Sequence, residues 1–465
     1  MEYSKEYIYE FSEFLDRINY HVLLTMILGE EIYFKDPLPA YALVKREIKK
    51  VDPEQQYILS FLLLGEPVNK KHMDSQLSSE CLEYLYSSGI INRDEEDYWL
   101  NSLVLTSHMN CYFLVSTPFF YPTCQNKVPS PYIGRDTFWL TRAIVNRVHG
   151  RVLDLCTGSG IQAIISAKVS AEVYAVDIDE RALEIAKFNG FLNKVDHKIT
   201  FYHGNLYEPV KDKEKFDFIL SNPPFIPIPD GVDYPKSGDG GEDGLRVVRE
   251  IYNGYLHYLK ENGTGLMIGQ AIGTEDRVFM FEEMKLLFSQ RNLDLYIFES
   301  LPLSIQADNF SNLSNRLQMN EYPVSALQWA AVNERLGASM YHSFFSVVSS
   351  VTVSSTHNLH IMDNRWTKSD IPILDSYEIT ETSKRYSVKS AQGKQAVMDE
   401  ETRIFIQEID GESTVDEIIK KLPLKIKLKY GKNASDYLYA KYMLTLAKLE
   451  RVGLLKKATP VEINP

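Results

Sequence analysis

Seven short apolar runs, separated by helical patterns, occupy the middle of the 465-residue chain. Continuous apolar runs that alternate with helices are typical of a parallel sheet covered by helices on both faces. The runs are RVLDL (151–155), EVYAVD (172–177), ITFYHGNL (199–206), FDFILS (216–221), GTGLMIGQ (263–270), LDLYIFES (293–300) and FFSVVSSVTV (344–353). The pattern therefore predicts an α/β domain over residues 129–360 with a seven-stranded, Rossmann-like sheet.

A helical region, residues 1–125, precedes the predicted sheet domain. It contains two helical patterns, DPEQQYILSFLL (52–63) and SSECLEYLYSSG (78–89), followed by two short strands about an acidic turn in IINRDEEDYWL (90–100). This order predicts a winged helix. Winged helices can bind DNA, but the second helix here carries few Lys or Arg residues, which favours a structural or substrate-covering role.

Residues 370–465 form a third predicted domain, small and again winged-helix-like. Its pattern comprises a strand pair, a helix, a turn and the helix TVDEIIKKL (414–422), for which Ser413 is the expected N-cap. A longer helix over 434–453 closes the domain. The segment KKLPLKIKLKYGK (420–432) alternates Lys with apolar residues, which indicates a half-buried strand with a solvated lysine face. Docking of an acidic peptide on that lysine face is the alternative interpretation.

Composition limits the partners and the cellular setting. The formal net charge is −13, so the surface lacks the overall basic character of nucleic-acid-binding proteins. The four cysteines form no CxxC pair and have no His at ligand spacing, which indicates reduced intracellular thiols and no metal site. The longest apolar run, Tyr57–Gly65, is too short to cross a membrane, and the N-terminus lacks the pattern of a signal peptide. We expect a soluble cytoplasmic protein.

A glycine-rich turn follows the first predicted strand, in VLDLCTGSGIQAI. Gly158, Gly160 and Ala163 fit the GxGxxG/A spacing that places a nucleotide at a helix N-terminus, although a NAD site or a tight turn would also fit. Asp154 stands four residues before the first glycine, where it would repel a pyrophosphate and suit a cation. Asp177 ends the second predicted strand and can accept both hydrogen bonds of a ribose diol. An adenosine joined to a positive charge describes S-adenosylmethionine.

The elements DLCTGSG, AVDID and SNPPF together resemble the class I S-adenosylmethionine-dependent methyltransferases, in particular the release-factor glutamine N5-methyltransferase branch. IGRDT (133–137) is similar to the IPRPET-like element of that branch, and GGEDGLRVVREI (240–251) to its GGxDGLxxYRxI helix start. FFSVVSS (344–350) would be its antiparallel last strand, so the resemblance covers about 132–353. Three features depart from the pattern: Cys156 replaces a glycine, Asn205 replaces a common acid, and IGRDT is one residue shorter.

The resemblance implies S-adenosylmethionine as the cofactor. The residues that match its cofactor-binding motifs are Arg135, Thr137, Asp154, Cys156, Thr157, Gly158, Gly160, Asp177, Ile178, Asn205, Leu206 and Asn222.

SNPPF follows the fourth predicted strand and supplies the candidate catalytic residues Asn222, Pro223 and Phe225. The nucleophile in this branch is a planar nitrogen whose delocalised lone pair attacks poorly. The Asn222 side-chain oxygen and the Pro223 carbonyl can accept its two N–H groups, while proline, with a fixed φ and no N–H, presets the loop. Phe225 can stack on the planar group. These residues predict methyl transfer to nitrogen, with positioning as the main source of catalysis.

The substrate is less constrained by the sequence. The prediction is an N-methyltransferase acting on an amide or amine of a peptide, protein or natural product. The alternatives are a nucleic-acid base methyltransferase at adenine N6 or guanine N2, and a non-catalytic binding protein on a degenerate core. Lys236 and Asp233 could contact substrate, although solvated loop charges are the simpler interpretation.

The C-terminal domain offers a hint about partners. DGESTVDEIIKKL is similar to a helix of the small peptide-chaperone domains of quinone-cofactor biosynthesis. Such domains bind leader peptides by adding a strand at an exposed sheet edge. Peptide docking is therefore one expectation for this domain, and a packing or homodimerisation module is the other.

Overall fold

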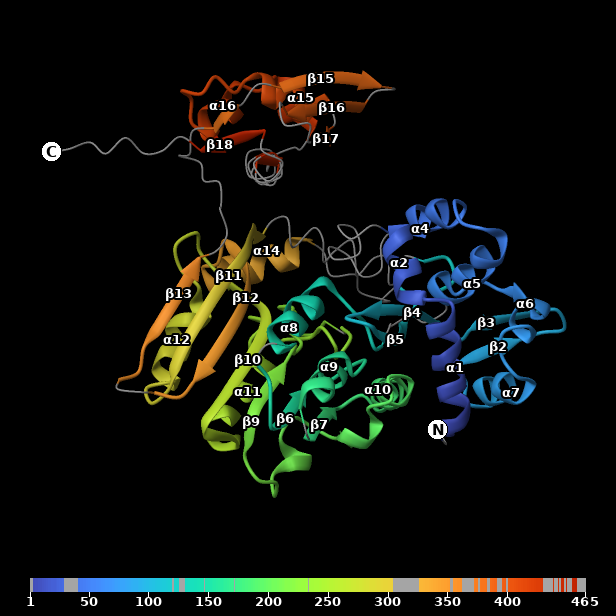
Figure 1. Ribbon diagram of the computed structural model, residues 1–465. Helices are drawn as coiled ribbons and strands as arrows, with labels where there is room; N and C mark the ends of the chain where they lie inside the picture. Colours follow the sequence, from blue (N-terminus) through green and yellow to red (C-terminus); the bar gives the residue numbers. More distant parts are fainter. Residues whose placement is uncertain are drawn as a thin grey trace.

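The computed structural model of the chain is organised around one large sheet, with a helical unit before it and a small α/β unit after it (Figure 1). It describes residues 3–28, 41–118, 121–124, 130–145, 147–170, 172–232, 234–303, 326–351, 354–361, 372–374, 377–382, 385–390, 395–398 and 400–429, and single residues or short stretches between 438 and 457.

The central sheet has eight strands in the order β13-β11-β12-β10-β9-β6-β7-β8. Its strands are β6 (Arg151–Leu155), β7 (Glu172–Asp177), β8 (Ile199–His203), β9 (Phe216–Ser221), β10 (Leu259–Gly273), β11 (Asn292–Pro302), β12 (Met340–Ser349) and β13 (His357–Ile361). Strands β6 to β10 run parallel, and β12 is antiparallel to both β10 and β11, as expected for the FFSVVSS segment.

The prediction of seven strands was wrong by one, because β13 adds a parallel strand beside β11. Its sequence, HNLHI, lacks the apolar run that marked the other strands. The strand lies at the sheet edge, where His360 stacks on Tyr296 with ring centroids 4.4 Å apart and bonds to Asp294 at 3.1 Å. An edge strand of this polarity carries no burial signal in the sequence.

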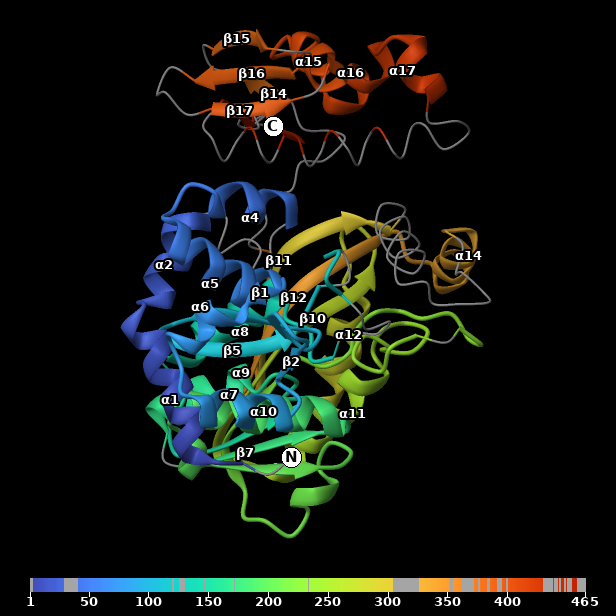
Figure 2. The same cartoon turned by 90° about the vertical axis from the view of Figure 1, so that its right-hand side faces the viewer.

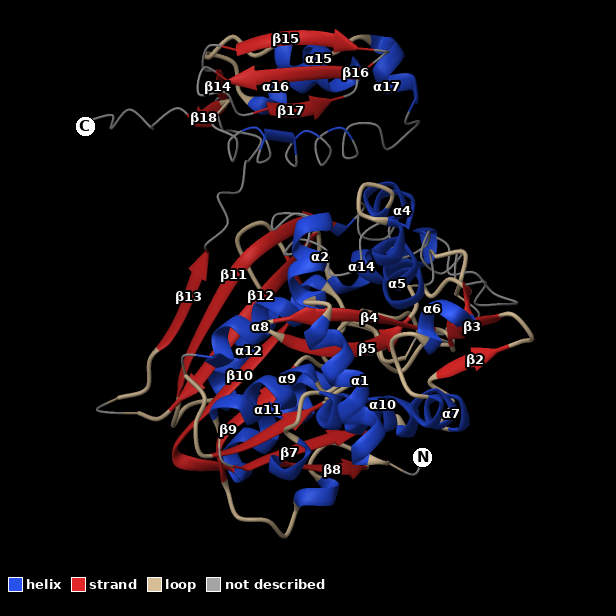
Figure 3. Cartoon of the chain, turned by 45° about the vertical axis from the view of Figure 1, so that its right-hand side comes forward, coloured by secondary structure: helices blue, strands red, loops and turns tan. Residues whose placement is uncertain are grey.

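Helices cover both faces of the sheet (Figure 3). One face of the sheet packs against α8 and α9, and the other face packs against α11 and α12, which gives one apolar core on each face. Successive residues of a strand point to opposite faces, so Val152 lies in the core with α8 and α9, and Leu153 lies in the core with α11 and α12. The helices are α8 (Arg135–Val145), α9 (Ile161–Val169), α10 (Glu180–Leu192), α11 (Arg246–Tyr258), α12 (Phe279–Leu287) and α14 (Ala326–Leu336), with short 3₁₀ turns at Asp196–Lys198 and Glu208–Val210.

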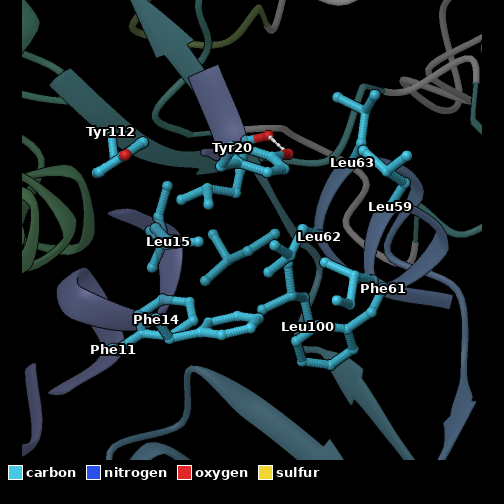
Figure 4. Close-up of a cluster of buried hydrophobic side chains, with 14 of the residues drawn as sticks. Phe11, Phe14, Leu15, Tyr20, Leu59, Phe61, Leu62, Leu63, Leu100 and Tyr112 are labelled. Atoms are coloured by element: carbon cyan, nitrogen blue, oxygen red, sulfur yellow. Dashed lines mark hydrogen bonds between the residues drawn. The ribbon is translucent and has the colours of Figure 1, made fainter. Parts of the chain in front are cut away.

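The N-terminal unit shares its apolar core with the sheet domain. Phe11, Phe14 and Leu15 of α1 meet Phe61 and Leu62 of α5 in this core (Figure 4), which also includes three side chains of α10. The unit's helices are α1 (Lys5–Arg17), α2 (Tyr20–Leu28), α4 (Tyr41–Ile48), α5 (Pro53–Leu64), α6 (Lys70–Asp74) and α7 (Ser79–Ser87). Its strands are β1 (Val68–Asn69), β2 (Ile91–Arg93), β3 (Asp97–Leu100), β4 (Leu103–His108) and β5 (Cys111–Ser116).

The two helices and the strand pair expected in this unit are present as α5, α7, β2 and β3. Helix α5 begins after Asp52, whose side chain accepts from the Gln55 amide at 3.0 Å, and it ends at Gly65, whose φ is 65°. The segment between α5 and α7 forms β1 and α6. Strand β1 completes a three-stranded sheet in the order β1-β3-β2.

The C-terminal unit combines a three-stranded sheet, β15-β16-β17, with helices (Figure 2). Its strands are β14 (Pro372–Leu374), β15 (Tyr377–Thr382), β16 (Arg385–Ser390), β17 (Gln395–Met398) and β18 (Leu455–Lys457), and its helices are α15 (Glu400–Gln407), α16 (Val415–Lys421) and α17 (Leu424–Lys429). Most of the predicted closing helix, 434–453, lies outside the described residues.

Two predictions for this unit were wrong in detail. The N-cap of α16 is Thr414, which forms a capping box with Glu417, while the Ser413 hydroxyl donates to Asp410 in the preceding turn. Of the lysine-rich segment, Leu424–Lys429 forms helix α17 rather than a strand, and Lys420 and Lys421 end α16. A run of this length cannot distinguish the two periods, and Pro423 immediately before it suits the start of a helix.

Three features of the described residues concern membrane crossing, metal binding and disulfide formation. Within the described part of the chain, no helix is both long and apolar enough to cross a membrane. The same residues contain no cluster of three or more His, Cys, Asp or Glu side chains placed to hold a metal ion. The cysteines are free thiols.

Candidate active site

A cavity of about 960 Å³ opens at the carboxyl ends of β6, β7 and β9. Open α/β sheets bind their ligands at this edge, and the volume is at the upper end of the range for small-molecule sites. The cavity brings together residues from the glycine-rich turn, the end of β7, the NPPF loop and the start of α8, which are far apart in the sequence. Of the predicted cofactor-binding residues it is lined by Thr137, Cys156, Thr157, Gly158, Asp177, Ile178, Asn205, Leu206 and Asn222.

Asp154 lies behind the glycine-rich turn rather than on the cavity wall. Its Oδ2 accepts from the Thr157 hydroxyl at 2.5 Å and from the Ala163 amide at 3.1 Å, so it joins the turn to the first residues of α9. Burial raises the pKa of this carboxyl to about 7. Its Oδ1 is buried and has no hydrogen-bond partner among the described residues. The described lining of the cavity does not include Asp154, so any effect on a ligand would act through the turn.

The two glycines of the turn have different physical roles. A Cβ at Gly158 would meet nothing within 4 Å, and this residue lines the cavity, which leaves the backbone open to a ligand. Gly160 has a φ of 79°, and a Cβ there would come within 3.0 Å of Ala186 in α10. Gly160 therefore allows helix α10 to approach the turn, while Gly158 allows a ligand to approach it.

Cys156 occupies a backbone conformation that favours glycine. Its φ is 59°, in the left-handed region that costs a residue with a Cβ roughly 1–2 kcal/mol. The turn therefore stores some strain in this chain. Burial raises the pKa of the Cys156 thiol well above its ordinary value, so the group is neutral at the cavity wall.

Asp177 ends β7 with its carboxylate on the cavity wall. Its Oδ2 accepts from the Gly158 amide at 2.7 Å and its Oδ1 from the Asp179 amide at 2.9 Å. Burial raises the pKa of Asp177, and these two backbone hydrogen bonds act in the opposite direction. Since each carboxylate oxygen can accept more than one hydrogen bond, both oxygens can still accept from a ligand.

The remaining predicted cofactor residues lie around the same wall. Ile178, which is 51% exposed, and Leu206 offer apolar surface beside the exposed Asn205. Thr137 is buried and its hydroxyl accepts from the Gly134 amide at 3.4 Å. Arg135 begins α8, and its side chain lies outside the described residues. Asp233 also lies outside them, whereas the exposed Lys236 lines the cavity.

Asn222 lies directly after β9 and makes an unexpected contact. Its Nδ2 donates a hydrogen bond to Oδ2 of Asp136, a residue 86 positions earlier in the first turn of α8. Its Oδ1 is buried and has no hydrogen-bond partner among the described residues. An unsatisfied buried acceptor costs roughly 1–3 kcal/mol, and such atoms in native proteins commonly mark a ligand or water site.

Backbone groups of the loop that carries Pro223 and Phe225 hydrogen-bond to neighbouring segments. The Phe225 carbonyl accepts from the Tyr341 hydroxyl at 3.1 Å, and Ile226 exchanges backbone hydrogen bonds with Gly238 and Gly240 at 2.9 Å. Pro223 and Phe225 both line the cavity beside Asn222. The three predicted catalytic residues thus share one wall, on a loop anchored at several points.

Sequence reasoning missed Asp136, although it lies within the quoted IGRDT element. Tyr234 and Glu250 also line the cavity and were not singled out. No spacing rule connects Asp136 with Asn222, because their proximity depends on how α8 packs on the sheet. The sequence did offer one signal: Asp136 is an acid within IGRDT and lies between Arg135 and Thr137, which were both predicted to be site residues.

Residues 134–277 match the family model described as the methyltransferase small domain. This matched segment contains the glycine-rich turn, Asp177 and the NPPF loop in the order that the cavity brings together. Residues 134–277 are a class I S-adenosylmethionine-dependent methyltransferase domain. The family model covers less than a third of the chain, so the flanking units fall outside this assignment.

Relatives of known name lie in the branch that the motifs indicated. A ribosomal protein uL3 glutamine methyltransferase of Bradyrhizobium diazoefficiens is 39% identical over 148 residues, which cover 30% of this chain and 46% of the relative. A release factor glutamine methyltransferase of Clostridium acetobutylicum is 32% identical over 165 residues, which cover 32% of this chain and 55% of the relative. The chain thus spans about half the length of these relatives.

Solved structures are more distant. The tRNA m1G37 methyltransferase of M. jannaschii matches with a TM-score of 0.31 and 14% identity, over 59% of this chain and 68% of that one. A likeness at this level carries no argument about this chain.

The cavity residues fit S-adenosylmethionine, the cofactor of this domain family. The Asp177 carboxylate retains acceptor capacity for a ribose diol, and the open face of Gly158 leaves room for a ligand against the turn. Asn205, Ile178 and Leu206 offer a polar and apolar surface for a base. Acidic side chains outnumber Lys and Arg in the described lining, which suits a ligand with a positive charge; the acids are Asp136, Asp177, Asp179, Glu180, Asp239 and Glu250, and the cations are Lys236 and Arg246.

Proposed function

We propose that this chain transfers a methyl group from S-adenosylmethionine to the side-chain amide nitrogen of a protein or peptide. The observation that carries the proposal is the buried Asn222 Oδ1, a hydrogen-bond acceptor that has no partner among the described residues and belongs to a residue of the cavity wall. An acceptor-rich wall suits a nucleophile that arrives as a hydrogen-bond donor. A carboxamide NH₂ is such a group.

The chain's residues would act by positioning and polarisation. Asn222 Oδ1 and the Pro223 carbonyl would accept the two N–H groups of the substrate, raise the electron density on its nitrogen and stabilise that nitrogen as it pyramidalises. Phe225 would hold the planar group. The cofactor supplies a methyl group on a positively charged sulfur, and the nitrogen's proton leaves to solvent after transfer. Alignment of this kind can contribute roughly 7–11 kcal/mol.

A protein substrate is favoured over a nucleic acid by charge and by similarity. The two relatives described above are both named as glutamine methyltransferases, one for a ribosomal protein and one for a release factor. The formal net charge of −13 opposes binding to a phosphate backbone. A base amine would also present N–H groups to Asn222, so methylation of a nucleic-acid base remains the second candidate.

The terminal units would bind or cover the substrate. In the N-terminal unit, the order α5, β1, α6, α7, β2, β3, with a sheet ordered β1-β3-β2, supports a winged helix within residues 1–125. In the unit assigned to 370–465, β15 and β17 are the outer strands of the described three-stranded sheet. An extended peptide could add to such an edge, which supports peptide docking there.

Radiolabelled S-adenosylmethionine incubated with purified protein and cell extract tests the proposal. We expect the label in the protein fraction, released on acid hydrolysis as methylamine because acid cleaves the methylated amide, with release factor and ribosomal protein uL3 as first purified probes. Asn222→Ala should lose most of this labelling and keep its calorimetric affinity for S-adenosylmethionine. Label confined to RNA or metabolites, or equal labelling by Asn222→Ala, would contradict the proposal.

A further inference from the structure

The contact between Asp136 and Asn222 determines which end of the Asn222 amide is available to a ligand. A carboxylate can only accept hydrogen bonds, so the NH₂ end of the amide must face it. A reversed amide would place its oxygen against Asp136 Oδ2, with no proton between the two oxygens. The orientation with Nδ2 on Asp136 therefore leaves Oδ1 for the cavity's ligand.

We infer that Asp136 is a positioning residue that fixes the orientation of the Asn222 amide and thereby restricts the methyl acceptor to a group that donates hydrogen bonds. This inference rests on the proposed function and deepens it. A carboxamide nitrogen satisfies the restriction, whereas a carboxylate oxygen, which has no proton to donate, would face an acceptor and be disfavoured. A glutamine side chain would thus be distinguished from a glutamate by the polarity of one atom.

The local structure leaves room for the Asp136 carboxylate. A Cβ at Gly134 would come within 2.3 Å of Asp136 Oδ1, so a side chain at this position would displace the carboxylate. Thr137 accepts from the Gly134 amide at 3.4 Å and is itself buried. Asp136 also lies in the first turn of α8, where a negative charge is favourable. The lack of a side chain at Gly134 therefore leaves space for the contact between Asp136 and Asn222.

The contact can be tested without knowledge of the substrate, by a double-mutant cycle on the full chain. The variants are Asp136→Asn, Asn222→Asp and the double variant that carries both changes. Asn222→Asp alone sets two carboxylates against each other, so one of them must be protonated in the folded protein. The double variant restores a donor–acceptor pair with the polarity reversed, and residue 222 still offers an acceptor oxygen to the cavity.

The measurements are thermal melting of each variant over a range of pH and titration with S-adenosylhomocysteine. Asn222→Asp should melt below the wild type at neutral pH by several degrees, and the deficit should shrink toward mildly acidic pH, where the shared proton is available. The double variant should recover most of this deficit, while Asp136→Asn should stay close to the wild type. Asp136→Asn should bind S-adenosylhomocysteine within about threefold of wild type, a difference of about 0.65 kcal/mol, because the turn and Asp177 are unchanged. Asp212→Asn, in the exposed loop before β9, is the matched control.

Equal melting deficits in Asn222→Asp and the double variant, at every pH, would overturn the inference, because the two positions would then act independently. With an acceptor identified, Asp136→Asn should lower kcat at least tenfold with little change in KM, and the double variant should recover part of that loss. Unchanged kcat in Asp136→Asn would also overturn it. If no acceptor is found, the proposed function fails, and the melting cycle still decides whether Asp136 orients Asn222.

Discussion

Two acids, Asp154 and Asp177, accept hydrogen bonds from the glycine-rich turn but lie on different sides of it. Asp154 accepts from the Thr157 hydroxyl and the Ala163 amide behind the turn, whereas Asp177 accepts from the Gly158 amide on the cavity wall. Burial raises the pKa of both carboxyls. Asp154 therefore shapes the turn, and Asp177 is the acid that a ligand can touch.

The raised pKa of Asp154 leads to a prediction about stability. The folded-state pKa is about 7 and the ordinary value is 3.8, so the folded protein retains a proton that the unfolded chain releases between these two values. The contribution of Asp154 to stability is therefore greatest at low pH and is lost as the pH rises toward about 7. Asp154→Asn cannot ionise. Its free energy of unfolding, relative to the wild type, should rise with pH in this window by up to about 1.4 kcal/mol per pH unit.

Denaturant unfolding of both proteins at several pH values measures this difference, and Asp212→Asn serves as the control for a solvated acid. The slope with pH is the informative quantity, because the asparagine amide also changes hydrogen bonding in a way that does not depend on pH. A difference that stays constant with pH would show that the Asp154 carboxyl ionises in the folded protein as it does in the unfolded chain.

At the level of elements, helix α10 completes the hydrogen bonding of strand β5. Asn189 accepts from the Leu114 amide at 2.8 Å and donates to its carbonyl at 2.9 Å, and Asn193 does the same for Tyr112 at 2.8 and 2.7 Å. Asn189 lies in α10 and Asn193 is its C-cap, and these two residues, four apart, match residues two apart on the strand. Asn189 also donates to the carbonyl of Ser159 in the glycine-rich turn, at 2.9 Å. The N-terminal unit and the cofactor turn are therefore connected through one side chain.

Paired substitutions separate these two connections. Asn189→Ala and Asn193→Ala each leave a buried strand amide and carbonyl unsatisfied, so each should lower the free energy of unfolding by roughly 2–5 kcal/mol. Only Asn189→Ala also frees the Ser159 carbonyl, so only this variant should weaken S-adenosylmethionine binding measurably. Calorimetry on both variants makes the comparison. Equal cofactor affinities would show that the turn holds its shape without the hydrogen bond from Asn189 to the Ser159 carbonyl.

The elements that could be predicted from the sequence are those whose signal is local. The β6 and β7 runs were bounded correctly, because buried strands are continuously apolar. Edge strand β13 and helix α17 were not, since the first has polar side chains and the second is too short to show a period. The glycine-rich turn, Asp177 and Asn222 could be located from motif order. Asp136 could not be assigned a role, because its contact with Asn222 depends on the packing of α8.

At the scale of the whole molecule, the two flanking units differ in how they are attached. The core of the N-terminal unit includes Ile185, Phe188 and Leu192 of α10, so removal of that unit would expose an apolar face of the sheet domain. The C-terminal unit has a core of its own, and among the described residues this core includes none from the sheet domain. Figure 1 shows this unit, in orange and red, apart from the large sheet.

This difference predicts the outcome of truncation. A chain without residues 370–465 should stay folded and bind S-adenosylmethionine with wild-type affinity, because the cavity and the three large cores remain. If the C-terminal unit binds the substrate outside the cavity, its loss removes binding that is equal in the ground and transition states. KM for the protein substrate should then rise with little change in kcat.

Deletion of the N-terminal unit is the contrasting control, and it should give an aggregating or unfolded protein because the α10 side chains lose their cover. Steady-state kinetics and calorimetry on the C-terminal truncation decide the role of that unit. Wild-type KM in a soluble truncation would show that the C-terminal unit takes no part in recognition, since a docking site that contributes binding cannot be removed without raising KM.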